Sequence, residues 1–263
     1  MSYNEYIMKT IIIKLGGSVI TAKRSRKPRI ERAVIQAIAR DIVAYRKRNP
    51  GVGIVLLHGA GSFGHPLAHR HGLVHGVPTT ARMVAAAKTI ASMRTFGNLL
   101  CDILWKQGLP VVPVQSSAAI PFGRRNDMIV RLLQVGAIPL LNGDVVLRNG
   151  RTDIMSADEQ VVELARTLRP SKIVFLTDVE GVFLRFPPTE NETPPRKITR
   201  DDVRGIVRGT ARTRSRTDVT GGMQGKLSEL LGLRRMSVIV CSGKKPHALL
   251  RAVDGSIGTV LVL

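Results

Sequence analysis

A lysine and a glycine-rich turn end the first strongly apolar run of the chain. The run, residues 10–14, contains three consecutive isoleucines before Lys14, and β-branched runs of this kind are typical of buried strands. Gly16, Gly17 and Ser18 follow at once, and glycine lets a ligand approach the backbone closely. A strand, a glycine turn and a lysine are the parts of a phosphate site, although a turn beside a solvated lysine has the same sequence.

Further turns of this kind decide between those two interpretations. Residues 14–18 fit neither the Walker A spacing nor the dinucleotide-binding spacing, so their assignment depends on the rest of the chain. In open parallel sheets, ligands bind beyond the carboxyl ends of the strands, and we therefore expect the turns to meet at one site. The other segments follow apolar runs or precede a helix, and they are residues 58–65, Asn142-Gly143-Asp144, Thr177-Asp178 and Gly221-Gly222.

Apolar runs alternate with amphipathic segments along the chain, which predicts an α/β fold with a mainly parallel central sheet sandwiched between helices. Asn149-Gly150 predicts a hairpin, and Ser156 with Glu159 predicts a helix start. The basic residues at 204–216 predict a loop, and the turn at 218–226 predicts a helix continuing through Arg235. The other predicted strands are residues 52–57, 110–114, 137–141, 172–177, 237–241 and 259–263, and the other helices are 31–48 and 80–106.

Composition limits the class of protein. The chain has 263 residues, 44% of them hydrophobic, and only two cysteines, Cys101 and Cys241, which makes a disulfide framework or a cysteine zinc site an unsuitable interpretation. No apolar run approaches the ~20 residues of a membrane span, and no basic leader is visible. We therefore expect a soluble, cytoplasmic protein without a membrane partner.

The net charge of +21 leaves several partners open. It suits nucleic acid, anionic small substrates, or a charge spread over solvated faces. The basic residues are dispersed, and only 4% of residues are aromatic. We expect small anionic substrates and no nucleic acid, with nucleic-acid binding kept as a competing hypothesis.

The ordered turns resemble the motif series of the amino acid kinase superfamily over nearly the whole chain. Within it, residues 58–65, His-Gly-Ala-Gly-Ser-Phe-Gly-His, and residues 218–223 are most similar to the isopentenyl phosphate kinases. The resemblance implies an amino acid kinase-like αβα sandwich, with an acceptor-binding lobe at about 1–168 and a nucleotide-binding lobe at about 169–263. It also implies a homodimer.

The resemblance further implies ATP-dependent phosphorylation of isopentenyl phosphate to the diphosphate, in isoprenoid precursor synthesis by the alternative mevalonate route, with Mg²⁺ bound to the nucleotide. Transfer to a phosphate acceptor depends on positioning and charge neutralisation. The resemblance assigns catalysis to Lys14, Lys23, His65 and Asp158. It assigns ATP binding to Lys14, Gly16, Gly17, Ser18, Gly61, Asp178, Gly221, Gly222 and Lys226, and acceptor binding to Ala60, Gly61, His65, Gly143 and Ala157. No residue is assigned to a metal.

Each assignment has a simpler alternative. Lys23 can be a solvated loop charge, His65 can cap its own loop, and Asp158 can be a first-turn acid favoured by the helix dipole. Ala157 stands where the family usually has glycine, which affects how closely the backbone approaches the acceptor phosphate. Residues 124–127 also depart from the family pattern.

The organic part of the acceptor needs a small apolar pocket. The predicted helix at 80–106 offers Met83, Ala87, Ile90 and Met93, although such spacing more often marks a helix face in the core. A sister kinase that acts on another small phosphate or phosphonate, such as fosfomycin, is the alternative function.

Overall fold

The computed structural model describes residues 8–22, 27–116, 122–185, 188–189, 192–210 and 222–263. The strands are β1 (Thr10–Leu15), β2 (Gly53–His58), β3 (Val111–Val114), β4 (Ile138–Asn142), β5 (Asp144–Arg148), β6 (Arg151–Met155), β7 (Lys172–Thr177), β8 (Lys197–Thr199), β9 (Ser237–Ser242) and β10 (Thr259–Val262). The helices are α1 (Gly17–Ile20), α2 (Arg32–Arg48), α3 (Gly61–Arg70), α4 (Thr80–Trp105), α5 (Phe122–Gln134), α6 (Ala157–Leu168), α7 (Arg200–Thr210), α8 (Gly222–Leu230) and α9 (Ala248–Val253).

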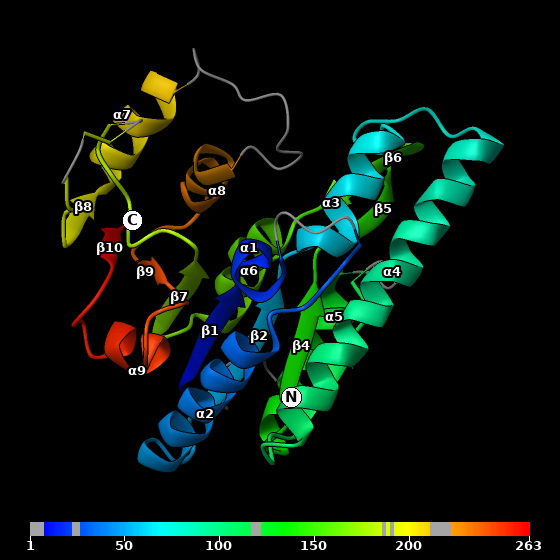
Figure 1. The fold of residues 1–263 in the computed structure, drawn as a ribbon. Helices are drawn as coiled ribbons and strands as arrows, with labels where there is room; N and C mark the ends of the chain where they lie inside the picture. Colours follow the sequence, from blue (N-terminus) through cyan, green and yellow to red (C-terminus); the bar gives the residue numbers. More distant parts are fainter. Residues whose placement is uncertain (1–7, 23–26, 117–121, 186–187, 190–191, 211–221) are drawn as a thin grey trace.

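The described strands form an eight-stranded sheet in the order β3-β4-β2-β1-β7-β9-β10-β8, and a separate hairpin of β5 and β6. Within the large sheet, β9 and β10 pair antiparallel and the other neighbouring strands pair parallel. The predicted mainly parallel α/β fold is therefore confirmed (Figure 1). Because β1 and β2 lie in one half of the sheet and β7 and β9 in the other, β1 and β7 meet at its centre.

Helices cover both faces of this sheet, and the side chains of β1 alternate between them. Ile11 and Ile13 point to the face covered by α2, α4 and α9. Ile12 points to the opposite face, where α5, α6 and α8 pack. The alternation places Lys14 on the side of Ile12, and the β-strand geometry therefore aims the lysine toward α6 and α8.

The hairpin forms as its sequence predicts. Asn149 and Gly150 both have positive φ, 51° and 71°, which is the backbone that a two-residue turn of this kind requires. The hairpin packs against α3 and α4 through a small apolar cluster of its own. After the hairpin, the Ser156 hydroxyl accepts a hydrogen bond of 2.9 Å from the Glu159 backbone N–H, so the predicted cap of α6 is confirmed.

Two predicted elements were wrong. Residues 204–210 belong to helix α7 rather than to a loop, because Val203 and Ile206 turn inward and anchor a helix that is otherwise mainly polar. Residues 211–216 of the predicted loop lie outside the described residues. Helix α8 ends at Leu230, short of Arg235. Leu233, three residues after the end of the helix, is buried in the apolar cluster to which α6 and β9 contribute. In the described part of the chain, no helix combines the length and the apolar composition that crossing a bilayer requires.

The first two glycine turns touch through their backbones. A Cβ atom on Gly17 would lie 2.4 Å from the Gly61 nitrogen and 2.7 Å from its Cα atom. Gly61 itself has φ of 49°, which favours glycine. Since both contacts involve backbone atoms, no rotamer change can make room for a side chain. The carboxyl ends of β1 and β2 are therefore brought together more closely than other residues would allow.

We predict that Gly17→Ala lowers the free energy of unfolding by about 1–3 kcal/mol, because the methyl group forces the two turns apart. Urea-induced unfolding measures this difference. Gly205→Ala is the matched control: nothing lies within 4 Å of a Cβ atom at Gly205 in α7, so alanine should raise stability by up to about 1 kcal/mol. Equal stability of Gly17→Ala and the wild type would contradict the described contact.

Candidate functional site

The glycine turns at the carboxyl ends of β1, β2 and β4 lie side by side at one edge of the sheet. Leu15, His58 and Asn142 are cross-strand neighbours there, so the three strands end at the same level. Each turn is held by a bond from its glycine to the adjacent strand. The N–H groups of Gly16, Gly59 and Gly143 donate to the carbonyl oxygens of Leu176, Leu15 and His58 at 2.8, 3.0 and 3.2 Å, respectively.

Two ammonium groups and one carboxylate meet beside these turns. Asp158 Oδ1 lies 2.8 Å from Lys14 Nζ, and Asp158 Oδ2 lies 2.8 Å from Lys226 Nζ. The side chains are only 8%, 13% and 8% exposed for Lys14, Asp158 and Lys226. The three residues come from the end of β1, the first turn of α6 and the first turns of α8. This cationic trio therefore joins three elements that are far apart in the sequence.

Burial and mutual charge set the protonation of the trio. Burial alone would raise the pKa of Asp158, but the charges of Lys14 and Lys226 and their hydrogen bonds outweigh it and lower that pKa well below the usual range. Burial and the charge of Lys14 lower the pKa of Lys226 to about 8, against the opposing effect of Asp158. The carboxylate is thus held ionised, and the trio presents excess positive charge to the space beside it.

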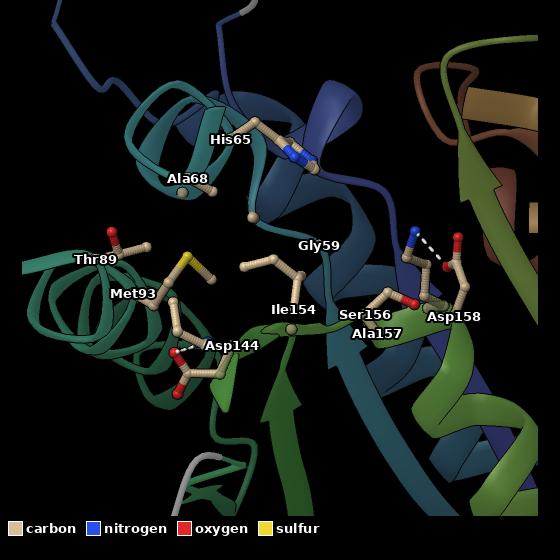
Figure 2. A pocket seen from close by; sticks show the side chains of 15 residues that line it. Gly59, His65, Ala68, Thr89, Met93, Asp144, Ile154, Ser156, Ala157 and Asp158 are labelled. Carbon is tan, nitrogen blue, oxygen red and sulfur yellow. Dashed lines mark hydrogen bonds and ion pairs between the residues drawn. The ribbon is translucent and has the colours of Figure 1, made fainter. Parts of the chain in front are cut away.

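A cavity of about 50 Å³ opens next to the trio. Figure 2 shows Asp158, Ser156 and Ala157 at one end, and Met93, Thr89 and Ala68 at the other. The lining of the charged end is completed by Lys14, Gly59, Ala60 and Gly143. The cavity is therefore polar and cationic at the carboxyl ends of the strands, and mainly apolar where it reaches α4 and the hairpin.

His65 lines the same cavity from α3. In Figure 2 it lies above Gly59, with its ring directed toward the polar end. Its helix begins with Gly61 and has no side-chain cap in its first turn. The first-turn N–H of Ser62 donates instead to the hydroxyl of Thr21 at 3.0 Å. A histidine and a helix N-terminus on one side of a cavity are suited to an anion.

The apolar end of the cavity comes from α3, α4 and the hairpin. Met93 lines it, as do Ala68, Val145 and Ile154. The other residues predicted for a prenyl pocket lie elsewhere: Met83 and Ala87 are exposed on α4, and Ile90 packs against the apolar cluster of the hairpin.

A buried carboxylate also lines the apolar end. Asp144 is 2% exposed, and its Oδ2 accepts a hydrogen bond of 2.7 Å from Gln115 Nε2. Its Oδ1 accepts a second bond, of 2.9 Å, from the backbone N–H of Val145. Both oxygens are thus engaged by the protein, so the carboxylate fixes the start of the hairpin.

The predicted nucleotide side is partly described. Ser18 Oγ donates to Asp178 Oδ1 at 2.8 Å, which links the first glycine turn to the end of β7. Gly222 has φ of 57° and begins α8, one turn before Lys226. Lys23 and Gly221 lie outside the described residues.

Some site residues carry no motif in the sequence. Val145 and Ile154 belong to the hairpin, and only its packing against α3 shows that they line the cavity.

His58 is the first histidine of the motif at 58–65. Its pKa is lowered to about 4 by burial, with a smaller contribution from Lys14, so it is neutral near pH 7. It packs edge-on against Phe96, with ring centroids 4.7 Å apart.

Comparisons with known proteins agree with this arrangement. The model of the amino acid kinase family matches residues 9–242. An isopentenyl phosphate kinase from Methanothermobacter thermautotrophicus is 34% identical over 87% of this chain and 88% of its own. One from Methanocaldococcus jannaschii is 28% identical over 94% and 95%, respectively.

Solved structures show the same relationship. An isopentenyl phosphate kinase structure aligns with a TM-score of 0.76 and 28% identity, covering 95% of this chain and 99% of that one. The UMP kinase of Bacillus anthracis, at 21% identity and a TM-score of 0.65, shares the fold alone. The chain therefore belongs to the amino acid kinase family and, within it, to the isopentenyl phosphate kinases.

Proposed function

We propose that the protein transfers the γ-phosphoryl group of ATP to isopentenyl phosphate, releasing ADP and isopentenyl diphosphate. The observation that carries this proposal is the two-ended cavity, cationic beside Lys14 and apolar beside Met93 and Ile154. A phosphate with a short hydrocarbon tail is complementary to both ends. A relative that is 34% identical is named an isopentenyl phosphate kinase, as is a solved structure that shares the fold at 28% identity.

The chemistry needs charge neutralisation rather than a base. An oxygen of the acceptor phosphate forms a bond to the γ-phosphorus while the bond from that phosphorus to the bridging oxygen of ADP breaks. The acceptor oxygen is already anionic, so no proton has to be removed. Lys14 and Lys226 neutralise the oxygens of the transferring group. Asp158, bound to both lysines, fixes their positions and is unsuited to act as a base because its pKa is so low.

We place the acceptor phosphate against His65 and the backbone of Ala60, Gly61, Gly143 and Ala157. These residues surround the polar end of the cavity or begin α3 and α6, whose N-termini favour an anion. Ala157 carries a methyl group where the family usually has glycine, and a Cβ atom on Gly143 would lie 3.1 Å from the Ala157 nitrogen. Because residue 143 is glycine, the acceptor phosphate can still approach the backbone nitrogen of Ala157, although residue 157 is alanine.

We place ATP on the other side of Lys14, at Gly16, Gly17, Ser18 and the N-terminus of α8. In this arrangement the acceptor lobe, about 1–168, and the nucleotide lobe, about 169–263, meet at β1 and β7. Mg²⁺ enters as part of the substrate MgATP. Among the described residues, no group of three histidine, cysteine or acidic side chains is placed to hold a metal ion, and Asp158 is already occupied by two lysines.

An acceptor panel tests the proposed function. Purified protein with MgATP is assayed for ADP release with isopentenyl phosphate, dimethylallyl phosphate, UMP, fosfomycin and carbamate. We expect the highest kcat/KM with isopentenyl phosphate, because its tail fills the apolar end of the cavity. Turnover of UMP or fosfomycin without turnover of isopentenyl phosphate would assign the protein to a sister activity.

We predict that His65→Ala raises the KM for isopentenyl phosphate about tenfold, the value of one hydrogen bond to a charged group. The KM for ATP should change little, because the ring lies on the acceptor side. Steady-state kinetics with each substrate varied in turn separates the two constants. His69→Ala, an exposed histidine one turn further along α3, is the control and should match the wild type. An unchanged acceptor KM in His65→Ala would remove this histidine from the acceptor site.

We predict that Asp158→Asn lowers kcat at least about 100-fold, because two buried ammonium groups lose the charge that holds them together. Glu159→Gln, the next residue of α6, is the matched control and should keep its activity, since Glu159 pairs with Arg148 at 2.7 Å.

We also predict that the effect of Asp158 on the free energy of unfolding depends on pH. Its folded pKa is lowered, so its stabilisation is complete above the unfolded value of about 3.9. It is lost as pH falls further, and the stability difference between wild type and Asp158→Asn should shrink below about pH 4. A difference independent of pH down to about 2 would contradict the shift.

A further inference from the structure

One aromatic ring faces both ammonium groups of the cationic trio. The Nζ atom of Lys226 lies 4.7 Å from the centroid of the Phe175 ring, and that of Lys14 lies 5.7 Å from it. A cation within about 6 Å of an aromatic face is attracted by the ring quadrupole, and more strongly where water is excluded. Phe175 is fully buried, and the lysines are nearly so.

The sheet register makes this arrangement a direct product of the fold. Lys14 of β1 and Phe175 of β7 are cross-strand partners, and such neighbours point to the same face of the sheet. Lys226 reaches the ring from α8, which packs on that face with Leu227. The ring is therefore fixed by the same hydrogen bonds that fix Lys14.

The trio needs such a partner because its charges do not balance. Two ammonium groups share a single carboxylate, Asp158, and burial of an uncompensated charge is costly. Among the described residues, two other titratable groups interact with the trio. His58 of β2 is neutral, and Glu229 of α8 has a raised pKa, caused by burial, then Glu159, then Asp158. An aromatic face adds electrostatic stabilisation without adding an anion that would repel phosphate.

We propose that Phe175 is a positioning residue of the phosphoryl-transfer site, whose ring face holds the ammonium groups of Lys14 and Lys226 together and protonated until the phosphates of the substrates arrive. The inference deepens the proposed kinase activity and rests on it for its catalytic meaning. The alternative is that Phe175 only fills the core. In that case the shape of the ring matters, and the negative potential of its face does not.

The test separates the effect of the ring's shape from the effect of its negative face. Phe175 is replaced by 4-fluoro-, 3,5-difluoro- and 3,4,5-trifluorophenylalanine, which keep the ring and progressively weaken its negative face. The pKa values of the lysine ammonium groups are measured by NMR in the protein without substrates, and kcat/KM for ATP is measured across pH. We expect the pKa of Lys226 to fall stepwise, by about one unit in the trifluoro protein. Because such a fall from about 8 lowers the protonated fraction of Lys226 at pH 8 from about one half to about one tenth, we also expect kcat/KM at pH 8 to fall about fivefold over the series.

Phe96 provides the matched control. It is fully buried, and its ring stacks on Phe63 at 4.5 Å and meets the neutral His58 edge-on at 4.7 Å rather than facing the lysines. The same fluorinated series there should leave the lysine pKa values and kcat/KM unchanged. Phe175→Leu, which fills similar space without a π face, should resemble the trifluoro protein. Lysine pKa values independent of fluorination at residue 175, or an equal response at Phe96, would overturn the proposal. Because the NMR readout needs no turnover, it decides the role of Phe175 separately from the acceptor panel, which decides the kinase activity.

Discussion

The sharing of one carboxylate by two buried lysines is the interaction on which the rest of the site depends. Lys14, Asp158 and Lys226 come from β1, α6 and α8, and their convergence requires that both helices pack on one face of the sheet. Two ammonium groups bound to the same buried carboxylate repel each other more strongly than they would in water, because little water screens their charges. Asp158 offsets that repulsion, so the sheet, the two helices and the charges are parts of a single electrostatic arrangement.

Under the proposed function, the same arrangement explains why the substrates complete the site. With the trio carrying excess positive charge in a poorly hydrated place, an arriving phosphate replaces stabilisation that water would otherwise give. The glycine turns allow this approach, because Gly17 and Gly61 have no side chains between the two strand ends. In that proposal, the charge of the trio attracts the phosphates, and the glycine turns give them space. Neither feature alone would distinguish a phosphoryl-transfer site from a simple anion site.

The sequence predicts the fold and the charged part of the site better than the apolar part. Lys14 lies just before one glycine turn and Lys226 lies just after another. Such turns have distinctive residue types at fixed places. Ser156 and Glu159 likewise predict the start of α6, which places Asp158. By contrast, Val145 and Ile154 are ordinary apolar residues of a hairpin, and their role follows only from packing against α3. Phe175 looks like any residue of a buried strand until the register places it beside Lys14. Met83 and Ala87 show the converse: helical spacing on α4 groups them with Met93, but the helix turns them to its exposed side.

The hairpin of β5 and β6 lies outside the large sheet, yet it supplies one wall of the cavity. Its two strands are contiguous in the chain and pair with each other, and Thr152 of β6 also forms an isolated antiparallel bridge with Gly76. The register between β1 and β7 does not involve them. The apolar residues of the hairpin can therefore change without altering the register that positions Lys14, whereas Arg148 of β5 still ties the hairpin to Glu159 of α6. Under the proposed function, the wall that faces the hydrocarbon tail and the trio that serves phosphoryl transfer come largely from different segments of the chain.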